Sequence, residues 1–217
     1  MTAPSERAAR QALVDAMQAL DAAGLNFGST GNASVRSADG LLITPTGVRP
    51  ADLDPKRMVK VTRKGTWRGK WRPSSEWQMH AAVYAAYPGA GAIVHTHADH
   101  CTALSCLRRG IPAFHYMMAA FGGDGVRCSG YATFGTKALG DRIVAAMRGR
   151  NACLIANHGM LCHAATAERA VANAIRLEAL ARQYLLALAA GNPVRLDRRQ
   201  MADVRLRYAT YGQQKRG

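Results

Sequence analysis

Three histidines that follow short apolar runs are the residues of this sequence best suited to chemistry. His95 and His97 end the run that begins at 91, and His158 follows the run 152–156. Such runs are typical of buried strands, in which residues two apart share a face. His95 and His97 therefore face the same way, and His158 can meet them if its strand is a neighbour. Grouped imidazoles hold divalent metal ions, whereas the simpler interpretation places each histidine in an ordinary core.

Three polar stretches are candidate binding sites for an anion. They are the glycine-rich loop 26–32, the loop 45–47 and the segment 73–76, which precedes a predicted helix. Such residues tolerate unusual backbone angles, expose amide N–H groups or lie at the positive end of a helix dipole. The alternative is structural: two tight turns, and a helix start at which Ser75 and Gln78 form a capping box. The residues alone leave both interpretations open.

Periodicity supplies the elements that must position these residues. Apolar positions at helical spacing predict helices, and short runs on either side of turn residues predict paired strands. We expect helices over about 5–23, 75–87, 98–107, 136–147 and 166–190, and hairpins that pair 33–36 with 41–44 and 58–62 with 66–70. His100 falls on the helix after the histidine pair, so we expect it to support the site rather than to bind metal.

The length and composition favour one soluble domain. At 217 residues the chain is long enough for a single buried core, so we expect one domain over 1–217 with a C-terminal tail from about 192. No apolar segment approaches the roughly 20 residues of a membrane-spanning helix, and the first residues do not resemble a signal peptide. We therefore expect a cytoplasmic protein.

Its five cysteines lack metal-type spacing and are expected to be buried free thiols.

The chain is strongly basic, with 29 Lys and Arg residues against 14 Asp and Glu and a formal net charge of +15. The charge is scattered rather than gathered in one block, which favours a solvated surface over a nucleic-acid patch. We therefore do not expect nucleic acid as a partner, and an RNA-binding accessory role stays a distant alternative. Anionic small molecules would be attracted to such a surface.

In this order, the stretches resemble the class II aldolase/adducin family, within it the fuculose-1-phosphate aldolase type. The resemblance runs from Gly24 to about Leu188, and its motifs lie at 31–36, 42–47, 73–76, 95–97, 115–117, 131–136 and 158–159. It implies an α/β fold, a three-layer α/β/α sandwich with a central, mostly antiparallel sheet. It also implies a homotetramer with active sites between subunits.

The resemblance also implies roles for individual residues. The implied ligands of Zn²⁺ are Glu76, His95, His97 and His158. The implied binding residues for the substrate phosphate are Ser29, Asn32, Thr46, Gly47, Ser74 and Ser75. Tyr116 is the implied proton donor to a neighbouring subunit's site, and Phe134 and Tyr211 are implied to border the aldehyde. The implied phosphate residues fall in the three stretches already identified as candidate anion sites.

The implied activity is that of a zinc-dependent aldehyde-lyase, which reversibly cleaves a ketose 1-phosphate to dihydroxyacetone phosphate and an aldehyde. The sugar would be fuculose 1-phosphate, 5-deoxyribulose 1-phosphate or 5-methylthioribulose 1-phosphate. A Lewis-acid cation suits this cleavage because it stabilises the enediolate charge, while Glu76 shuttles a proton. Pentulose-phosphate 4-epimerases and a methylthioribulose-1-phosphate dehydratase share the scaffold and remain alternatives.

Overall fold

A six-stranded antiparallel sheet forms the centre of the computed structural model, which describes residues 5–208, 210 and 211. The strand order is β3-β2-β1-β4-β8-β7. The strands are β1 (Asn32–Ser37), β2 (Gly40–Ile43), β3 (Val59–Thr62), β4 (Ala92–Thr96), β7 (Ala152–Ile155) and β8 (Gly159–Ala164). A second, smaller sheet pairs β5 (Ile111–Pro112) with β6 (Gly125–Val126). The predicted α/β fold with a mostly antiparallel sheet is confirmed.

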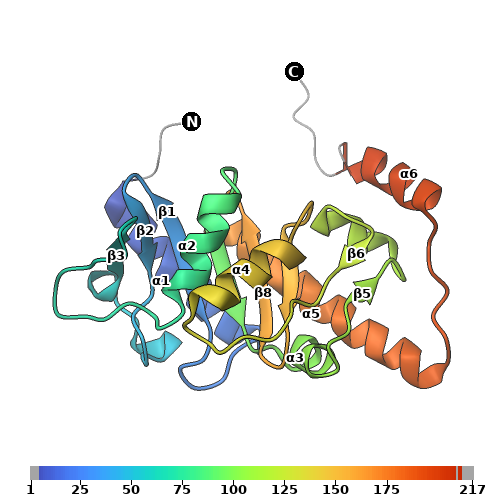
Figure 1. The fold of residues 1–217 in the computed structure, drawn as a ribbon, viewed down its shortest axis with the longest axis horizontal. Helices are drawn as coiled ribbons and strands as arrows, with labels where there is room; N and C mark the ends of the chain where they lie inside the picture. The colour runs from blue at the N-terminus through green and yellow to red at the C-terminus, as the bar shows by residue number, and fades with distance from the viewer. Residues whose placement is uncertain (1–4, 209, 212–217) are drawn as a thin grey trace.

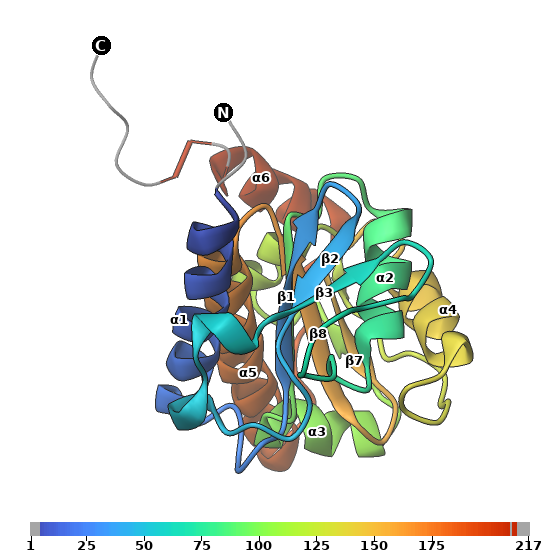
Figure 2. The same ribbon diagram turned by 90° about the vertical axis from the view of Figure 1, so that its left-hand side faces the viewer.

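Helices cover both faces of the large sheet, which gives three layers (Figures 1 and 2). α1 (Glu6–Ala22) and α5 (Ala167–Ala190) lie on one face, and α2 (Trp77–Ala86) and α4 (Lys137–Ala146) lie on the other. The remaining helices are α3 (Asp99–Cys106), α6 (Arg198–Tyr208) and three short 3₁₀ helices, η1 (Pro50–Asp52), η2 (Pro55–Arg57) and η3 (Tyr116–Phe121). None of the helices described is long and apolar enough to cross a membrane.

Each face of the sheet has its own hydrophobic cluster. On one face Leu20 of α1 and Leu177 of α5 are fully buried, and on the other Val83 of α2 and Ile143 of α4 are fully buried. Burial of a Val, Leu or Ile side chain contributes about 1.5–3 kcal/mol each, so these clusters fix the helices on the sheet. The sheet is thereby a rigid support for side chains at the ends of its strands.

Hydroxyl side chains begin three helices where the sequence predicts them. Ser5 accepts a hydrogen bond from the Ala8 N–H group at the start of α1 (3.3 Å). Thr136 and Thr166 do the same at the starts of α4 and α5. Each cap satisfies a backbone donor that the first helical turn leaves unpaired.

Two local predictions are wrong. Ser75 does not cap α2, because Glu76 occupies the N-cap position and makes no side-chain capping bond. The second predicted hairpin is reduced to β3 and a single bridge between Val61 and Trp67. Both differences have one physical reason. The segment before α2 pairs with the loop that follows β2, through a bridge between Pro73 and Pro45.

The C-terminal tail contains a helix, α6, that the periodicity did not indicate. Asp197 and Gln200 form a reciprocal capping box at its start, with both N–H···O distances at 2.8 Å. Met201 is fully buried, and the Leu196 N–H group donates to the Ala113 carbonyl (2.8 Å). α6 is thus docked on the region of η3, at the far end of the molecule from β3 (Figure 1).

The cysteine prediction is only partly right. Cys101, Cys153 and Cys162 are buried free thiols, but Cys106 is exposed and Cys128 is half-buried. Burial raises the pKa of the Cys128 thiol to about 11, so this thiol is not a reactive nucleophile.

Candidate metal centre

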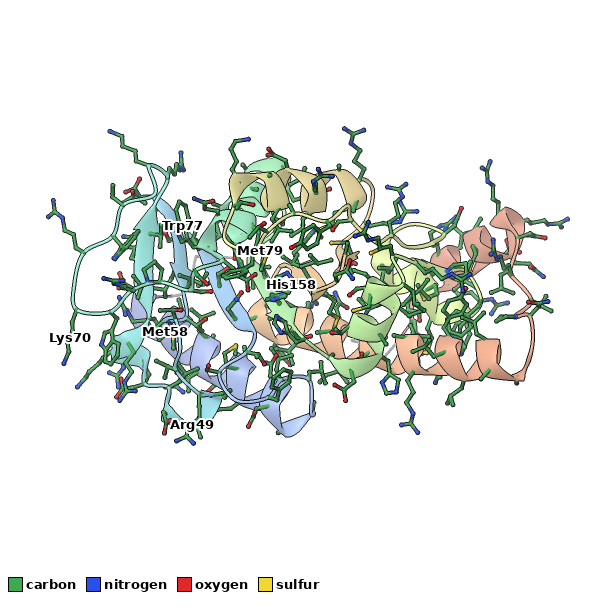
Figure 3. All side chains as sticks on the ribbon, turned by 60° about the horizontal axis from the view of Figure 1, so that its bottom comes forward. Arg49, Met58, Lys70, Trp77, Met79 and His158 are labelled. Atoms are coloured by element: carbon green, nitrogen blue, oxygen red, sulfur yellow. The ribbon has the colours of Figure 1, made fainter. Side chains whose placement is uncertain are left out.

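Four predicted ligand side chains meet at the C-terminal end of β4. Glu76, His95, His97 and His158 each offer one ligand atom, and these atoms all lie within 4.8 Å of one another. The Nε2 atoms of His95 and His97 are 3.0 Å apart. The two carboxylate oxygens of Glu76 lie 3.2 Å from the Nε2 atoms of His95 and His158. In Figure 3 His158 lies near the middle of the molecule.

The sheet topology brings these residues together. β8 pairs with β4, so Met160 lies opposite Thr96, and the turn before β8 carries His158 to the end of β4. The three imidazole rings have centroids 4.8–4.9 Å apart and planes inclined by 68–75°. Rings arranged in this way direct their nitrogens toward one shared point.

Hydrogen bonds to groups outside the cluster fix the orientation of the His95 ring and the position of the turn that carries His158. The Nδ1 atom of His95 donates to the Met160 carbonyl (2.8 Å), which leaves Nε2 facing the cluster. The turn that carries His158 is held by Ser105 of α3. The N–H groups of Asn157 and His158 donate to the carbonyl and the hydroxyl of Ser105, at 3.1 and 3.2 Å.

The cluster is electrostatically coupled. Burial opposes ionisation of Glu76, but the charge of His95 and its hydrogen bond outweigh burial, so the pKa of Glu76 is well below its ordinary value. Burial likewise opposes the protonation of His95, but Glu76 raises its pKa. For His97 and His158, burial and the charge of His95 lower the pKa to about 4. Both rings are therefore neutral ligands near pH 7.

This donor set fits a divalent cation. Glu76 and His95 are buried, and the Oε1 atom of Glu76 is buried without a hydrogen-bond partner. Two imidazole nitrogens 3.0 Å apart cannot both carry a proton without a clash. A cation would satisfy the unpaired oxygen and the facing nitrogens at once, and three imidazoles with a carboxylate are a ligand set typical of zinc.

The predicted anion-binding stretches lie beside Glu76. The Ser74 N–H group donates to the Thr44 carbonyl (2.9 Å), and the Thr46 N–H group donates to the Arg72 carbonyl (3.2 Å), so these two stretches run together. The Ser74 hydroxyl accepts from the Glu76 N–H group (3.3 Å). In the first stretch, the ring centroid of Phe27 lies 6.4 Å from that of His97.

A cavity of about 560 Å³ connects two of these stretches. Its lining includes Ser29 and Gly47 together with Arg49 and Arg57. Asn32 behaves differently from the other predicted phosphate residues, because its amide donates to Glu76 (3.0 Å) and its carbonyl oxygen faces His80 (2.6 Å). Asn32 thus contacts the metal centre itself.

The structure separates the three predicted aromatic residues. Phe134 is 64% exposed. The next residue, Gly135, lies close to the segment before α2: a Cβ atom added to Gly135 would be 3.0 Å from the Ser75 carbonyl oxygen. Tyr116 and Tyr211 are 52% and 83% exposed and make no described contact with the four ligands. Both lie near Tyr208 of α6: burial raises the pKa of Tyr208, and the two tyrosines add to this rise.

His100 and a second cavity lie outside the centre. His100 pairs through Nδ1 with Glu178 of α5 (2.6 Å). A cavity of about 850 Å³ lies between the C-terminal part of α5 and the pair β5–β6, and arginines supply much of its lining. Its lining contains none of the four ligands.

Sequence reasoning missed three buried partners of the centre, His80, Ser34 and Tyr84. They form a hydrogen-bonded chain that leads from Asn32 along α2. Their spacing in the sequence could have indicated them. His80 and Tyr84 follow Glu76 by four and eight residues and so share its helix face, and Ser34 follows Asn32 by two residues and so shares its strand face.

Comparison with known proteins supports a shared origin over nearly the whole chain. The model of the class II aldolase and adducin N-terminal domain matches residues 11–185. A 5-methylthioribulose-1-phosphate/5-deoxyribulose-1-phosphate aldolase of Rhodospirillum rubrum is 47% identical over 208 residues, which are 96% of this chain and 94% of that protein. An L-fuculose phosphate aldolase of Escherichia coli is 43% identical over 205 residues, with coverages of 94% and 95%.

The fold comparison agrees. A solved structure of an L-fuculose 1-phosphate aldolase aligns with a TM-score of 0.89 and 36% identity. The alignment covers 95% of this chain and 98% of that one.

Proposed function

Because the chain belongs to the class II aldolase and adducin family and is an aldehyde-lyase, we propose that it uses Zn²⁺ to cleave a ketose 1-phosphate reversibly. The products are dihydroxyacetone phosphate and an aldehyde. The observation that carries this proposal is the convergence of Glu76, His95, His97 and His158 within 4.8 Å, beside loops suited to a phosphate.

The residues divide the chemistry between them. Bound Zn²⁺ would supply a Lewis acid that stabilises the negative charge developing on the substrate oxygens. The side chains of Ser29, Asn32, Thr46, Ser74 and Ser75, with the Gly47 backbone, bind the phosphate. Arg49, Arg57 and Asp52 line a cavity with Ser29 and Gly47 and give that cavity a net positive charge. Glu76 is ionised at neutral pH and accepts and returns the proton at the substrate carbon.

The aldehyde half of the site is completed by a second subunit in this proposal. Tyr116 donates a proton to the aldehyde oxygen of a neighbour's substrate, and Tyr211 borders that aldehyde together with Phe134 of the subunit that holds the metal. The exposure of Tyr116 and Tyr211 near Tyr208 supports this division. A homotetramer with sites between subunits follows from it.

The sugar is proposed from the relatives. The Rhodospirillum rubrum relative is named for 5-methylthioribulose 1-phosphate and 5-deoxyribulose 1-phosphate, and the Escherichia coli relative for fuculose phosphate. We propose that this chain accepts ketose 1-phosphates of both kinds and differs among them in the aldehyde released. A cytoplasmic location fits this proposal, because membranes retain charged sugar phosphates.

The decisive experiment offers zinc-loaded protein these three ketose 1-phosphates and measures dihydroxyacetone phosphate. We expect its release from at least one sugar, and loss of release after chelation or in His158→Ala. A 4-epimerase would convert its sugar without that product, and a dehydratase would release water instead. Either result without dihydroxyacetone phosphate would replace the aldolase proposal.

A further inference from the structure

A buried chain of hydrogen bonds runs from the metal centre along α2. It passes from Glu76 through Asn32, His80 and Ser34 to Tyr84. The successive distances are 3.0 Å (Glu76 Oε2 to Asn32 Nδ2), 2.6 Å (Asn32 Oδ1 to His80 Nε2), 2.7 Å (His80 Nδ1 to Ser34 Oγ) and 2.9 Å (Ser34 Oγ to the Tyr84 hydroxyl). His80 and Ser34 are fully buried, and the other three are at most 7% exposed.

Two elements build this chain by simple spacing. Asn32 and Ser34 alternate along β1 and share one face of the strand. Glu76, His80 and Tyr84 are four residues apart along α2 and share one face of the helix. β1 and α2 therefore meet along a polar line within a layer that is otherwise apolar. Any of these buried polar groups would destabilise the folded state if it were left unpaired.

The amide of Asn32 fixes the direction of every bond. Its Nδ2 atom can only donate, so it donates to Glu76, and its Oδ1 atom can only accept, so His80 Nε2 must carry a proton. The Nδ1 atom of a neutral His80 then accepts from the Ser34 hydroxyl, and the Tyr84 hydroxyl donates to Ser34. The reverse orientation of Asn32 would place two acceptors against each other at the Glu76 carboxylate.

We propose that His80 is a positioning residue for Glu76. The imidazole nitrogens that face Glu76 are those that would hold the metal, so Asn32 is the side-chain donor left for this carboxylate among the residues described. The His80 N–H group prevents Asn32 from turning its amide. His80 thereby sets the direction of the carboxylate that binds metal and moves the proton.

The chain orients groups and does not conduct protons. A proton passing from His80 to Glu76 would have to cross the Asn32 amide, whose oxygen and nitrogen do not exchange a proton without an imidic acid form. Burial and the charge of His95 lower the pKa of His80 to about 3, which agrees with the neutral ring that the geometry requires. His80 therefore acts through Asn32 alone.

The test compares variants of His80 in the full-length protein loaded with Co²⁺ as a spectroscopic probe. His80→Phe fills the space but leaves Asn32 without a donor, whereas His80→Gln keeps an N–H donor and an acceptor. His163→Phe is the matched control, because His163 is an imidazole that packs on Tyr87 at the end of α2 without joining the chain. The readouts are the visible Co²⁺ spectrum, the Co²⁺ affinity and the imidazole N–H resonance of His80.

We expect His80→Phe to change the Co²⁺ spectrum and to weaken Co²⁺ binding or turnover by about ten- to a hundred-fold. His80→Gln should recover most of the loss, and His163→Phe should match the wild type. The wild type should show a slowly exchanging His80 Nε2–H signal that His80→Phe lacks. A wild-type spectrum, affinity and turnover in His80→Phe would overturn the proposal.

Two features keep the result interpretable. Only turnover rests on the proposed aldolase activity, so a protein inactive on every sugar still tests the positioning role through the Co²⁺ spectrum and the N–H signal. If His80→Phe does not fold, Ser34→Ala removes the bonds of the Ser34 hydroxyl to His80 Nδ1 and to the Tyr84 hydroxyl but keeps the bond between His80 and Asn32, and it should produce a smaller change of the same kind. An unaltered Co²⁺ spectrum and turnover in a folded Ser34→Ala, together with loss of the His80 N–H signal, would also contradict the proposal.

Discussion

Glu76 is buried and yet ionised, and its neighbours explain both properties. Burial alone would favour the neutral acid, but His95 and the amide of Asn32 stabilise the carboxylate. A carboxylate between three imidazoles can serve as a ligand and as a base, and the two roles can be separated by a substitution that keeps its shape.

Glu76→Gln should therefore retain most of the bound metal and lose turnover. The three histidines still supply the nitrogens, whereas the amide cannot accept a proton, so kcat should fall by about 10²- to 10⁴-fold. Metal content by atomic absorption and kcat for the best ketose 1-phosphate check this. Glu168→Gln, which removes the negative charge of an exposed side chain on α5, is the control for loss of a carboxylate. Unchanged turnover in Glu76→Gln would remove Glu76 from the mechanism.

The metal-free protein should lose stability as the pH falls below neutrality. In the folded state the pKa of His80 is about 3 and those of His97 and His158 are about 4, whereas in the unfolded chain they return to about 6.5. Between these values the unfolded state binds more protons, so the free energy of unfolding decreases as the pH decreases. The raised pKa of His95 acts in the opposite direction, but it concerns one ring, whereas the loss comes from three.

Urea unfolding of chelator-treated protein at pH 7, 6 and 5 measures this effect. We expect the midpoint to fall at each step. Bound Zn²⁺ should raise the midpoint most at pH 7, because protons compete with the metal for the imidazoles as the pH falls. A midpoint that is constant from pH 7 to pH 5 would show that these histidines are not held neutral.

At the scale of elements, α3 links the helical layer to the metal centre. Glu178 of α5 accepts hydrogen bonds from the N–H groups of His100 and Cys101 at the start of α3, both at 2.9 Å. At the other end of α3, Ser105 holds the turn that carries His158. The position of a metal ligand therefore depends on how α5 holds α3.

Glu178→Ala should destabilise the protein by about 1–2 kcal/mol, because it leaves two backbone donors of α3 without their cap. It should also lower metal affinity, since Ser105 and the His158 turn are less firmly placed. Urea unfolding and Zn²⁺ titration measure the two effects. Glu168→Ala removes an exposed carboxylate from the same helix and should change both values little.

At the scale of the whole molecule, the residues of the proposed site lie on two separate surfaces. The metal ligands and the anion loops lie at the end of β4, whereas Tyr116 and Tyr211 are exposed near α6. Figure 1 places α6 at the end of the molecule opposite β3. An assembly of several copies brings such surfaces together if a tyrosine of one copy reaches the metal of the next.

Mixing two inactive variants tests this arrangement. Glu76→Gln and Tyr116→Phe subunits, unfolded together and refolded at equal amounts, should recover about a quarter of the wild-type activity, because a quarter of the sites would combine an intact Glu76 with an intact Tyr116. Each variant refolded alone is the control. If Tyr116 acts within its own subunit, or does not act at all, mixing restores nothing beyond the sum of the two.

The sequence by itself determined the local structure around the site. The apolar runs before His95 and His158 predict β4 and β7, and the hydroxyls of Ser5, Thr136 and Thr166 predict helix starts, because these signals act over a few residues. A further local signal is the capping box of Asp197 and Gln200, which marks the start of α6. The capping-box pattern of Ser75 and Gln78 does not mark the start of α2, because contacts with a distant loop decide where this helix begins.

Only the tertiary structure decided what the polar residues do. Periodicity could not show that β8 lies between β4 and β7, and that pairing is what brings His158 to His95 and His97. Nor could it show that Asn32 contacts Glu76, because that contact forms together with a bond to His80, 48 residues away along the chain. Spacing determines which side chains share a face, but the packing of that face against another element determines what they contact.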